Sequence, residues 1–469
     1  MIAMTLAEVA EATGGRLQAA DPAVRVTGGV EFDSRRIGPG GLFVAFAGER
    51  VDGHDFAATA LAAGAVAVLG TRPVTSDAGP VPMVLVDDPL DAMARLARAV
   101  LDRLPELTVI GLTGSSGKTT TKDLIAQLAA GLGPTVAPAG SFNNELGHPY
   151  TVLRADASTR YLVLEMGARG IGHIRHLCAV APPRVGVVVN VGVAHIGEFG
   201  SVDAIATAKG ELVEALPADG VAVLNADDPR VAAMARRTGA RVVLAGEDPA
   251  ATVRAEQVTV DTRGRAAYQL VTPAGTAPVR LAVSGRHQVG NSLLAAAVAI
   301  ELGLTDPAAL AAALGELRLV STRRMDVFDR PDGITVIDDS YNANPASTAA
   351  ALRSLADLGR DRRTFAVLGY LAELGDYEHE GHAEVGRLAA ELGVHRLLVV
   401  GEQAASIRHG AAAVATWEGE SVLVTDQQAA IDLLRREITA GDVVLVKGSR
   451  YRTWEVADAL RDGAGEATA

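Results

Sequence analysis

A glycine-rich loop between an apolar run and a helical pattern constrains this fold more than any other feature. Residues 107–111 form the apolar run, residues 114–119 read G-S-S-G-K-T, and a helical pattern covers 121–132. In a strand–loop–helix unit, the loop N–H groups and the helix N-terminus point at an anion, lysine adds positive charge, and threonine can bind Mg²⁺. The expected phosphate-binding residues are Gly114, Ser115, Ser116, Gly117, Lys118, Thr119 and Thr120.

The spacing of this loop differs from the general rule for phosphate-binding loops. The rule G-x-x-x-x-G-K-[ST] requires a glycine where Leu112 stands, whereas the first glycine of this loop is Gly114. The alternative is a glycine-rich turn with a solvated lysine. The strand before the loop and the helix after it favour phosphate binding.

Length and composition limit the classes of protein to which this chain can belong. A chain of 469 residues suggests about three domains. Its net charge of −13 does not favour nucleic acid as a partner, and the single cysteine, Cys178, excludes an intramolecular disulfide and a multi-cysteine zinc site. The N-terminus has no basic leader, and no apolar run reaches the ~18 residues of a membrane span. We therefore expect a soluble cytoplasmic protein.

The N-terminal unit, residues 1–104, alternates short β-like runs with helical stretches, which is typical of a small α/β domain. It contains Asp33-Ser34-Arg35 and a second polar cluster at 52–55, each next to a strand signal. Each cluster is either a ligand-binding segment or a turn, because turns favour the same residue types. Pro105 breaks the last helical pattern and marks a boundary.

The central unit, residues 105–319, reads as β-α-β with near-continuous apolar strands. Three of these strands end in polar residues, Glu165, Asn190 and Asn225. In open parallel sheets the ligand crevice lies beyond the carboxyl ends of the strands, so these residues should meet the glycine loop. Two alternating segments at 252–260 and 266–271 predict an antiparallel hairpin, and an apolar helix follows at 291–302.

The third unit, residues 320–469, again alternates strands and helices and predicts a second doubly wound sheet. Lys447, in the string 447–450, follows a strand and can bind carboxylate or phosphate, although a charged loop is equally consistent with it. Arg324, between the second and third units, can reach a nucleotide across a cleft or remain solvated.

Three further residues are candidates for the metal chemistry of phosphoryl transfer. Glu165 supplies the hard oxygen that Mg²⁺ prefers. His195 can complete a second metal site or be a hydrogen-bonded loop histidine. Local sequence alone describes Lys209 as a solvated helix lysine.

Taken together, the motifs resemble the Mur ligases of bacterial cell-wall synthesis over nearly the whole chain. The DDSYNANP and FNNE strings are most similar to members that use D-alanyl-D-alanine. The matching segments are DSRR at 33–36, GLFVAF at 41–46, DGHD at 52–55, TGSSGKTT at 113–120, SFNNE at 141–145, LEMG at 164–167, NVGVAH at 190–195, AKGE at 208–211, NADD at 225–228, NSLLAA at 291–296, DDSYNANP at 338–345 and VKGSR at 446–450.

The resemblance implies an N-terminal substrate domain, a central ATPase-type domain with a parallel sheet and an antiparallel addition, and a C-terminal Rossmann-like domain. It also implies a reaction. ATP would phosphorylate the terminal carboxylate of UDP-N-acetylmuramoyl-tripeptide, and the amine of D-alanyl-D-alanine would displace phosphate. The cofactors would be ATP and two Mg²⁺ ions, and the enzyme would be a monomer.

Residue roles also follow from the resemblance. Lys118, His195 and Lys209 would be catalytic, and Lys209 would be carbamylated, which turns a cation into an oxygen ligand. The metal ligands would be Thr119, Glu165, His195 and Lys209. Asn291, Arg324 and Asp339 would bind ATP with the loop. The substrate residues would be Asp33, Ser34, Arg35, Asn143, Asn144, Asn342, Asn344 and Lys447.

Two segments depart from the family pattern. The family commonly has an acid and a methionine where Tyr370 and Leu371 stand, so no residue of 369–375 is included in the expected site. The arginine before the third domain lies in S-T-R-R-M rather than P-G-R, and the spacing to Asp338 selects Arg324 over Arg323.

Two other functions are compatible with parts of this pattern. One is another ATP-dependent amino acid ligase, such as a sibling muramyl ligase or a folylpolyglutamate synthetase-like enzyme. The other is a nucleotide-dependent switch that hydrolyses ATP to drive domain closure. The chain has no guanine-reading N-K-x-D string, and the polar strand ends of the third unit indicate a second substrate.

Overall fold

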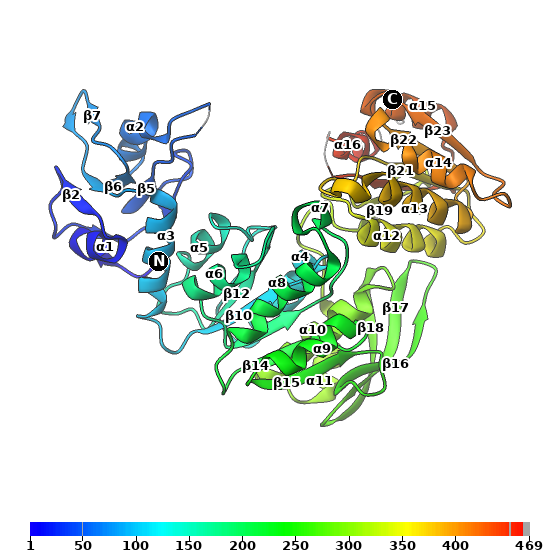
Figure 1. Cartoon of the computed structure of the whole chain (residues 1–469), viewed down its shortest axis with the longest axis horizontal. Coiled ribbons are helices and arrows are strands. Elements are labelled where there is room, and N and C mark those ends of the chain that lie inside the picture. Colours follow the sequence, from blue (N-terminus) through cyan, green and yellow to red (C-terminus); the bar gives the residue numbers. More distant parts are fainter. Residues whose placement is uncertain (49, 450–451, 463–469) are drawn as a thin grey trace.

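The computed structural model describes residues 1–48, 50–449 and 452–462, and it contains three large β-sheets, one in each third of the chain (Figure 1). Arg450, the last residue of the 446–450 motif, and the expected third-unit residues 463–469 lie outside this description. Among the described residues, no helix is long and apolar enough to cross a membrane.

The N-terminal sheet has five strands in the order β2-β9-β6-β5-β4. Local capping sets its helices: Thr5 and Glu8 form a capping box at the start of α1, and Asp88 caps α3. The elements are β1 (Met4–Thr5), α1 (Leu6–Thr13), β2 (Arg16–Gln18), β3 (Arg25–Val26), β4 (Val30–Glu31), β5 (Gly41–Val44), η1 (Gly53–Phe56), α2 (Ala57–Ala62), β6 (Ala65–Gly70), β7 (Thr75–Ser76), β8 (Gly79–Pro80), β9 (Met83–Leu85) and α3 (Pro89–Leu101).

The central sheet has nine strands in the order β11-β12-β10-β13-β14-β15-β16-β17-β18. The strands from β11 to β16 run parallel, and β16, β17 and β18 are antiparallel. The expected parallel sheet with an antiparallel addition is therefore confirmed, but the addition contains one strand more than the expected hairpin. The strands are β10 (Thr108–Thr113), β11 (Thr135–Val136), β12 (Tyr161–Glu165), β13 (Val185–Val188), β14 (Val221–Asn225), β15 (Arg241–Gly246), β16 (Val253–Val260), β17 (Arg265–Thr272) and β18 (Gly275–Ser284).

Helices cover both faces of the parallel part of this sheet (Figure 1), which explains why its strands are apolar on both sides. The helix predicted at 291–302 is α10, which begins three residues earlier. The helices are α4 (Lys118–Ala130), α5 (Gly147–Val152), α6 (His173–Val180), α7 (Ile196–Phe199), α8 (Val202–Glu214), α9 (Pro229–Ala233), η2 (Met234–Arg237), α10 (Gln288–Glu301) and α11 (Pro307–Glu316).

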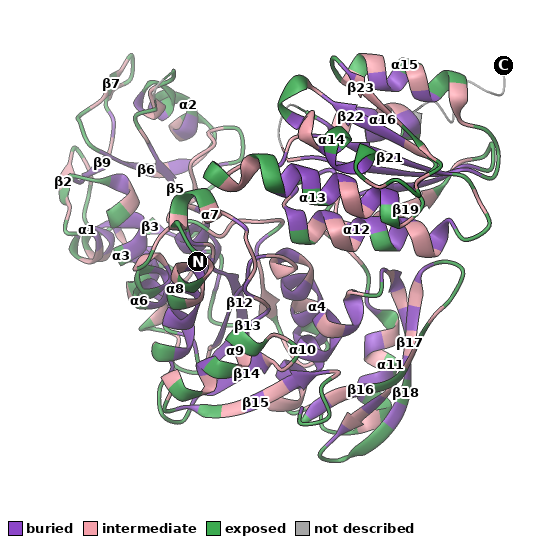
Figure 2. Ribbon diagram, turned by 45° about the vertical axis from the view of Figure 1, so that its right-hand side comes forward, coloured by how far each residue is buried: buried purple, intermediate pink, exposed green. Residues whose placement is uncertain are grey.

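The C-terminal sheet has six strands in the order β19-β20-β24-β21-β22-β23, and only β19 is antiparallel. Figure 2 shows its buried strands between partly exposed helices, as expected for a doubly wound sheet. The elements are β19 (Asp326–Asp329), β20 (Thr335–Asp338), α12 (Pro345–Leu358), β21 (Thr364–Leu368), η3 (Gly375–Tyr377), α13 (Glu378–Glu391), β22 (Arg396–Val400), η4 (Glu402–Ala404), α14 (Ser406–Ala412), β23 (Glu420–Val424), α15 (Gln427–Glu437), β24 (Val443–Lys447) and α16 (Trp454–Asp462).

The strand register brings the predicted polar residues to one edge of the central sheet. β10 lies between β12 and β13, and Leu112 of β10 pairs with Glu165 of β12. Thr113, the last residue of β10, pairs with Val188 and donates a hydrogen bond to the carbonyl of Met166. The glycine loop therefore leaves the sheet between the strand ends that carry Glu165 and Asn190.

Candidate active site

The glycine loop leads directly into α4, and two of its glycines are required by close packing. Gly117 has φ +76° at the start of the helix, and a Cβ there would lie 3.0 Å from the side-chain oxygen of Asn291. A Cβ on Gly114 would lie 2.8 Å from Val189. A left-handed backbone and close approach both favour glycine, so the loop geometry depends on these positions.

Asn190 holds the loop from the neighbouring strand end. Its side-chain oxygen accepts hydrogen bonds from the backbone N–H groups of Ser115 (3.0 Å) and Ser116 (2.9 Å). Its amide nitrogen donates to the carbonyl of Ser116 at 3.1 Å. Asn190 was predicted at a strand end but was not among the expected site residues.

We expect Asn190→Ala to raise the KM for ATP about tenfold, because two loop N–H groups lose an acceptor and the loop loses its preorganised shape. Asn190→Asp retains an acceptor oxygen but loses the donor to Ser116 and adds a negative charge beside the phosphates, so it should raise KM at least as much. ATP titrations of phosphate release and melting curves of both variants test this, and equal KM values for Asn190→Ala and wild type would contradict it.

Lys118 is folded back onto its own loop. Its Nζ donates to the carbonyl of Gly114 at 2.8 Å and lies 3.4 Å from that of Ser115. Burial lowers the pKa of Lys118, the carboxylate of Glu165 opposes this shift, and the guanidinium of Arg324 adds to it. The position of this charge beside the loop carbonyls is suited to an incoming phosphate.

Glu165 is the centre of a polar cluster at the end of β12. One carboxylate oxygen accepts hydrogen bonds from the Thr119 hydroxyl at 2.9 Å, and the other accepts from Ser141 at 3.0 Å and Asn143 at 2.6 Å. Arg324 donates to the Thr119 hydroxyl at 3.2 Å from the far side of the cleft. The residues expected to bind metal (Thr119, Glu165) and nucleotide (Arg324) therefore lie together, and Asn143 contacts the proposed metal ligand.

His195 and Lys209 also line the cavity. His195 immediately precedes α7 with φ +62°, and its Nδ1 lies 2.6 Å from Oε2 of Glu373. Burial lowers the pKa of His195, Glu373 opposes this shift, and Lys118, Lys209 and Arg169 reinforce it. Lys209 is 4% exposed, and burial, followed by the nearby charge of Lys118, lowers its pKa well below the usual value. Lys209 is therefore not the solvated helix lysine that local sequence suggests.

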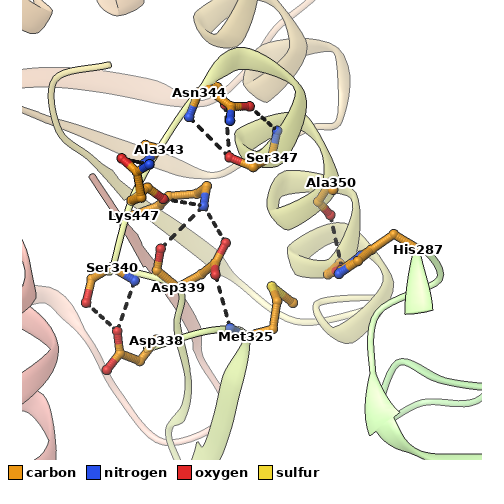
Figure 3. A network of polar contacts seen from close by, with 12 residues as sticks. His287, Met325, Asp338, Asp339, Ser340, Ala343, Asn344, Ser347, Ala350 and Lys447 are labelled. Carbon is orange, nitrogen blue, oxygen red and sulfur yellow. Dashed lines mark hydrogen bonds and ion pairs between the residues drawn. The ribbon is translucent and has the colours of Figure 1, made fainter. Parts of the chain in front are cut away.

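The C-terminal contribution is organised around an ion pair between Asp339 and Lys447 (Figure 3). Lys447 also donates to the carbonyl of Asn342 at 3.0 Å, and Asp339 accepts from the backbone N–H of Met325 at 3.1 Å. Asn344 caps α12, accepting from the backbone N–H of Ser347 at 2.9 Å. Burial lowers the pKa of Lys447, and Asp339 opposes this shift.

Arg324 and Asn291 come from different segments and both lie close to the loop and the start of α4. The Arg324 guanidinium lies 4.1 Å from the ring centroid of Tyr341, close enough for a cation–π contact. Asn291, on α10, accepts a hydrogen bond from Thr121 and donates one to Gln288. Spacing to Asp338 thus selected the arginine that contacts the loop, whereas Arg323 pairs with Asp458.

One cavity of about 910 Å³ joins residues from all three sheets. Most expected site residues line it: the loop residues 115–120, Asp33 of the first domain, and a set from the other two domains. That set is Asn143, Asn144, Glu165, His195, Lys209 and Asn291, and then Arg324, Asp339, Asn342, Asn344 and Lys447. Gly114, Ser34 and Arg35 are not among its lining residues.

Near Asp33 the lining differs from the sequence prediction. Arg35 is 86% exposed in its side chain and bonds to Asp33, whereas Arg36 lines the cavity with Phe32 and Glu31. Glu31 also accepts hydrogen bonds from the hydroxyl of Tyr150, which ties the first domain to α5. The segment therefore lines the cavity, and Arg36 is the arginine that faces it.

Segment 369–375, which was left out of the expected site, also contributes. Ala372 and Glu373 line the cavity, whereas Leu371 is buried in the C-terminal core. Tyr370 donates a hydrogen bond to Glu378 at 2.6 Å, so a carboxylate lies beside the position that usually carries an acid.

The cavity has the donor set of a site for a metal-bound phosphate. Thr119 and Glu165 supply adjacent hard oxygen donors, and Lys118 and Arg324 supply positive charge. Among the described residues no cluster of three His, Cys, Asp or Glu side chains forms a ready-made metal site. A divalent ion here therefore fits the pair Thr119 and Glu165 completed by phosphate oxygens, which is the usual arrangement for Mg²⁺.

The fold and the cavity define a nucleotide-dependent enzyme with three α/β domains. Comparison with known proteins makes this specific: the models "Mur ligase family, catalytic domain", "Mur ligase middle domain" and "Mur ligase, glutamate ligase domain" match residues 27–100, 112–299 and 323–450. The chain belongs to the Mur ligase family.

Similar proteins cover the whole length of the chain. The UDP-N-acetylmuramoyl-tripeptide–D-alanyl-D-alanine ligases of Mycobacterium bovis and Escherichia coli are 50% and 37% identical, over 98% and 97% of both chains. The structure of MurF from Acinetobacter baumannii has a TM-score of 0.86 at 30% identity, covering 98% of this chain and 99% of that one. A MurF ligase from Thermotoga maritima in complex with ADP has a TM-score of 0.80 at 29% identity, covering 94% and 99%.

Proposed function

We propose that this chain catalyses the ATP-dependent ligation of D-alanyl-D-alanine to UDP-N-acetylmuramoyl-tripeptide, giving the UDP-muramoyl-pentapeptide, ADP and phosphate. The observation that carries this proposal is the cavity in which the phosphate loop, Glu165 and residues of both outer domains face one another. Full-length relatives with this activity in their names support the choice of substrates. We place the reaction in the cytoplasm and the active enzyme as a monomer.

The chemistry needs activation of a carboxylate, because an ionised carboxylate does not react with an amine. In the first step a carboxylate oxygen of the tripeptide attacks the γ-phosphorus and ADP leaves. In the second step the amine nitrogen attacks the acyl carbon, phosphate leaves with that oxygen, and the amine loses a proton. Lys118 and Arg324, which contact the loop, would stabilise the charge on the phosphoryl oxygens during the first step.

We propose domain borders near 104/105 and 319/320, because α3 ends at Leu101, β10 begins at Thr108, α11 ends at Glu316 and β19 begins at Asp326. The first domain would hold the UDP-linked substrate through the segment expected from the sequence, Asp33, Ser34 and Arg35, with Asp33 and the neighbouring Arg36 as the residues that line the cavity. The central loop and Asn291 would hold ATP, with Arg324 and Asp339 from the third domain. Asn143, Asn144, Asn342, Asn344 and Lys447 would face the acyl and amine groups.

Mg²⁺ would be held by Thr119 and Glu165, and a second ion by His195 and a carbamylated Lys209. These ions supply charge neutralisation of the phosphates and of the transferred phosphoryl group. The burial of Lys209 supports carbamylation, because a lowered pKa leaves more of the amine neutral, and only the neutral amine can add CO₂. The carboxylate so formed would replace an unfavourable buried ammonium.

The proposed function is tested by phosphate release from purified protein with all three substrates and with each left out in turn. Release should require the tripeptide substrate and the dipeptide together, and mass spectrometry should find the pentapeptide. With ¹⁸O in the tripeptide's terminal carboxylate, one labelled oxygen should appear in the phosphate. Vigorous phosphate release without the dipeptide, or unlabelled phosphate, would reject the mechanism.

Replacing either acceptor separates this function from that of related ligases. A single amino acid in place of D-alanyl-D-alanine should give little product. A UDP-N-acetylmuramoyl-dipeptide in place of the UDP-N-acetylmuramoyl-tripeptide should also give little product. Faster turnover with a single amino acid would identify a different member of the family.

A further inference from the structure

The loop that carries His195 is in contact with a turn of the C-terminal domain. α7 packs against η3, and Ile196 packs against both the central and the C-terminal cores. In Figure 1, α7 lies at the end of the central domain that faces the C-terminal domain. The two segments, 194–199 and 371–377, are called the interdomain contact below.

The contact joins backbone to backbone, and it depends on two glycines. The N–H of Gly197 donates a hydrogen bond to the carbonyl of Glu373 at 3.2 Å. A Cβ on Gly197 would lie 2.5 Å from the nitrogen of Gly375, a distance that real Cβ atoms essentially never show. Any larger residue at Gly197 therefore forces the two segments apart.

This approach brings one side chain of the C-terminal domain onto a candidate metal ligand. Oε2 of Glu373 lies 2.6 Å from Nδ1 of His195, and Oε1 lies 3.9 Å from the guanidinium of Arg169. Glu198, on α7 itself, is farther away, at 3.9 Å from the same Nδ1. Glu373 is therefore the carboxylate that forms the ion pair with the histidine ring, although the contact does not have the geometry of a hydrogen bond at Nδ1.

A histidine that binds a metal through one ring nitrogen is usually oriented by a carboxylate or carbonyl at its other ring nitrogen. It sets the tautomer and the ring orientation, and it leaves the opposite nitrogen for the metal. In this chain the orienting carboxylate comes from a different domain than the histidine. That arrangement makes the geometry of the histidine dependent on domain docking.

We propose that Glu373 is a positioning residue for His195, so that the metal site is completed only when the C-terminal domain is docked against α7. The ion pair places the Glu373 carboxylate beside Nδ1, so Nε2 would be the ring nitrogen left for the ion. The inference rests on the proposed function in one respect, the assignment of His195 as a metal ligand. It adds a coupling between the interdomain contact and that ligand.

The experiment uses full-length protein labelled with ¹⁵N-histidine, Mn²⁺ as a paramagnetic substitute for Mg²⁺, and AMP-PCP, an ATP analogue that is not hydrolysed and has no nitrogen in its phosphate chain. Electron spin echo modulation detects ¹⁵N bound to Mn²⁺. The wild type should show this modulation. Glu373→Ala should lose most of it and should weaken Mn²⁺ binding about 10–100-fold, the range usual for loss of an orienting partner.

Two further variants separate positioning from misfolding. Gly197→Ala leaves every candidate ligand in place but blocks the backbone approach, and it should lose the modulation as Glu373→Ala does. Asp376→Ala is the matched control, because Asp376 is an exposed acid in the same turn, and it should retain the wild-type modulation and Mn²⁺ affinity. Glu373→Gln, which retains an acceptor oxygen, should recover part of the modulation.

Wild-type modulation that persists in Glu373→Ala, or its absence in the wild type, would overturn this inference. Failure of the proposed function is seen separately, because wild-type phosphate release and pentapeptide formation do not depend on the Mn²⁺ spectra. In turnover assays Glu373→Ala should lower kcat about 10–100-fold with a smaller change in the KM for the dipeptide. Equal effects of Asp376→Ala and Glu373→Ala would indicate that Glu373 has only a structural role, and this result would also overturn the inference.

Discussion

Lys209→Ala is expected to lower kcat by about 10²–10³-fold while the protein remains folded, a loss on the scale of removing one preorganised electrostatic group. Lys209 is buried in the cavity wall, and its lowered pKa makes it a poor site for a permanent ammonium. Its substitution removes the carbamate proposed to neutralise phosphate charge. Because Lys209 lines the cavity rather than the packed core of the sheet, the variant should remain folded, and melting curves check this.

Chemical rescue distinguishes the carbamate from a structural lysine. Formate or acetate should enter the space left in Lys209→Ala and restore part of kcat. Lys209→Met is the matched variant, because it fills the same space with an apolar chain and should not be rescued. Steady-state phosphate release with increasing formate measures this. A near-normal rate for Lys209→Met, or equal responses of both variants to formate, would contradict the carbamate.

The wild type offers an independent check. After removal of dissolved CO₂, activity should fall and should return on addition of bicarbonate. Protein equilibrated with ¹³C-bicarbonate should show a carbamate carbon resonance that is absent in Lys209→Ala. A wild type with full activity in CO₂-free buffer and no such resonance would show that Lys209 acts as a free amine.

The central sheet and its loop were predictable because both signals are local. The glycine loop follows β10 directly, and parallel register alone brings Glu165 and Asn190 to the same edge. The family resemblance added roles that spacing does not give, above all for Lys209. The burial of Lys209 depends on how α8 packs on the rest of the domain. The residues next to Lys209 in the sequence do not indicate this packing.

β18 was missed for a physical reason. Its sequence contains Pro278, and a proline inside a run normally argues against a strand. β18 is the edge strand of the nine-stranded sheet, and its Pro278 pairs with Gln269 of β17. No strand in the described part of the chain lies on the outer side of β18, so no hydrogen-bond donor is needed there. The edge strand of a sheet therefore tolerates a proline that a central strand would not.

The site residues that sequence reasoning missed act at longer range. Glu373 lies 178 positions from His195 in the chain, and its contact exists only because two glycines allow two domains to meet. Arg36 replaces Arg35 at the cavity because Arg35 turns back onto Asp33. Neither outcome is encoded in residue type or spacing, since both depend on which way a turn directs its side chains.

Glu165→Gln is expected to lower kcat by about 10²–10³-fold at saturating ATP and to raise the Mg²⁺ concentration needed for half-maximal rate. The fold should tolerate the change, because the glutamine oxygen can still accept the hydrogen bonds from Ser141 and Asn143. The amide nitrogen, however, replaces the oxygen that accepts from Thr119. A hard anionic ligand is thereby lost beside the phosphates, while the volume of the side chain is retained.

The measurement is a Mg²⁺ titration of phosphate release with melting curves in parallel. Glu301→Gln makes the same chemical change at a largely buried glutamate that pairs with Arg241 outside the cavity, and its Mg²⁺ midpoint and kcat should match those of the wild type. If Glu165 acts through the metal, excess Mg²⁺ should recover part of the lost rate. If it serves only to hold Thr119 and Asn143 in place, the Mg²⁺ midpoint should not move, and that result would remove Glu165 from the metal site.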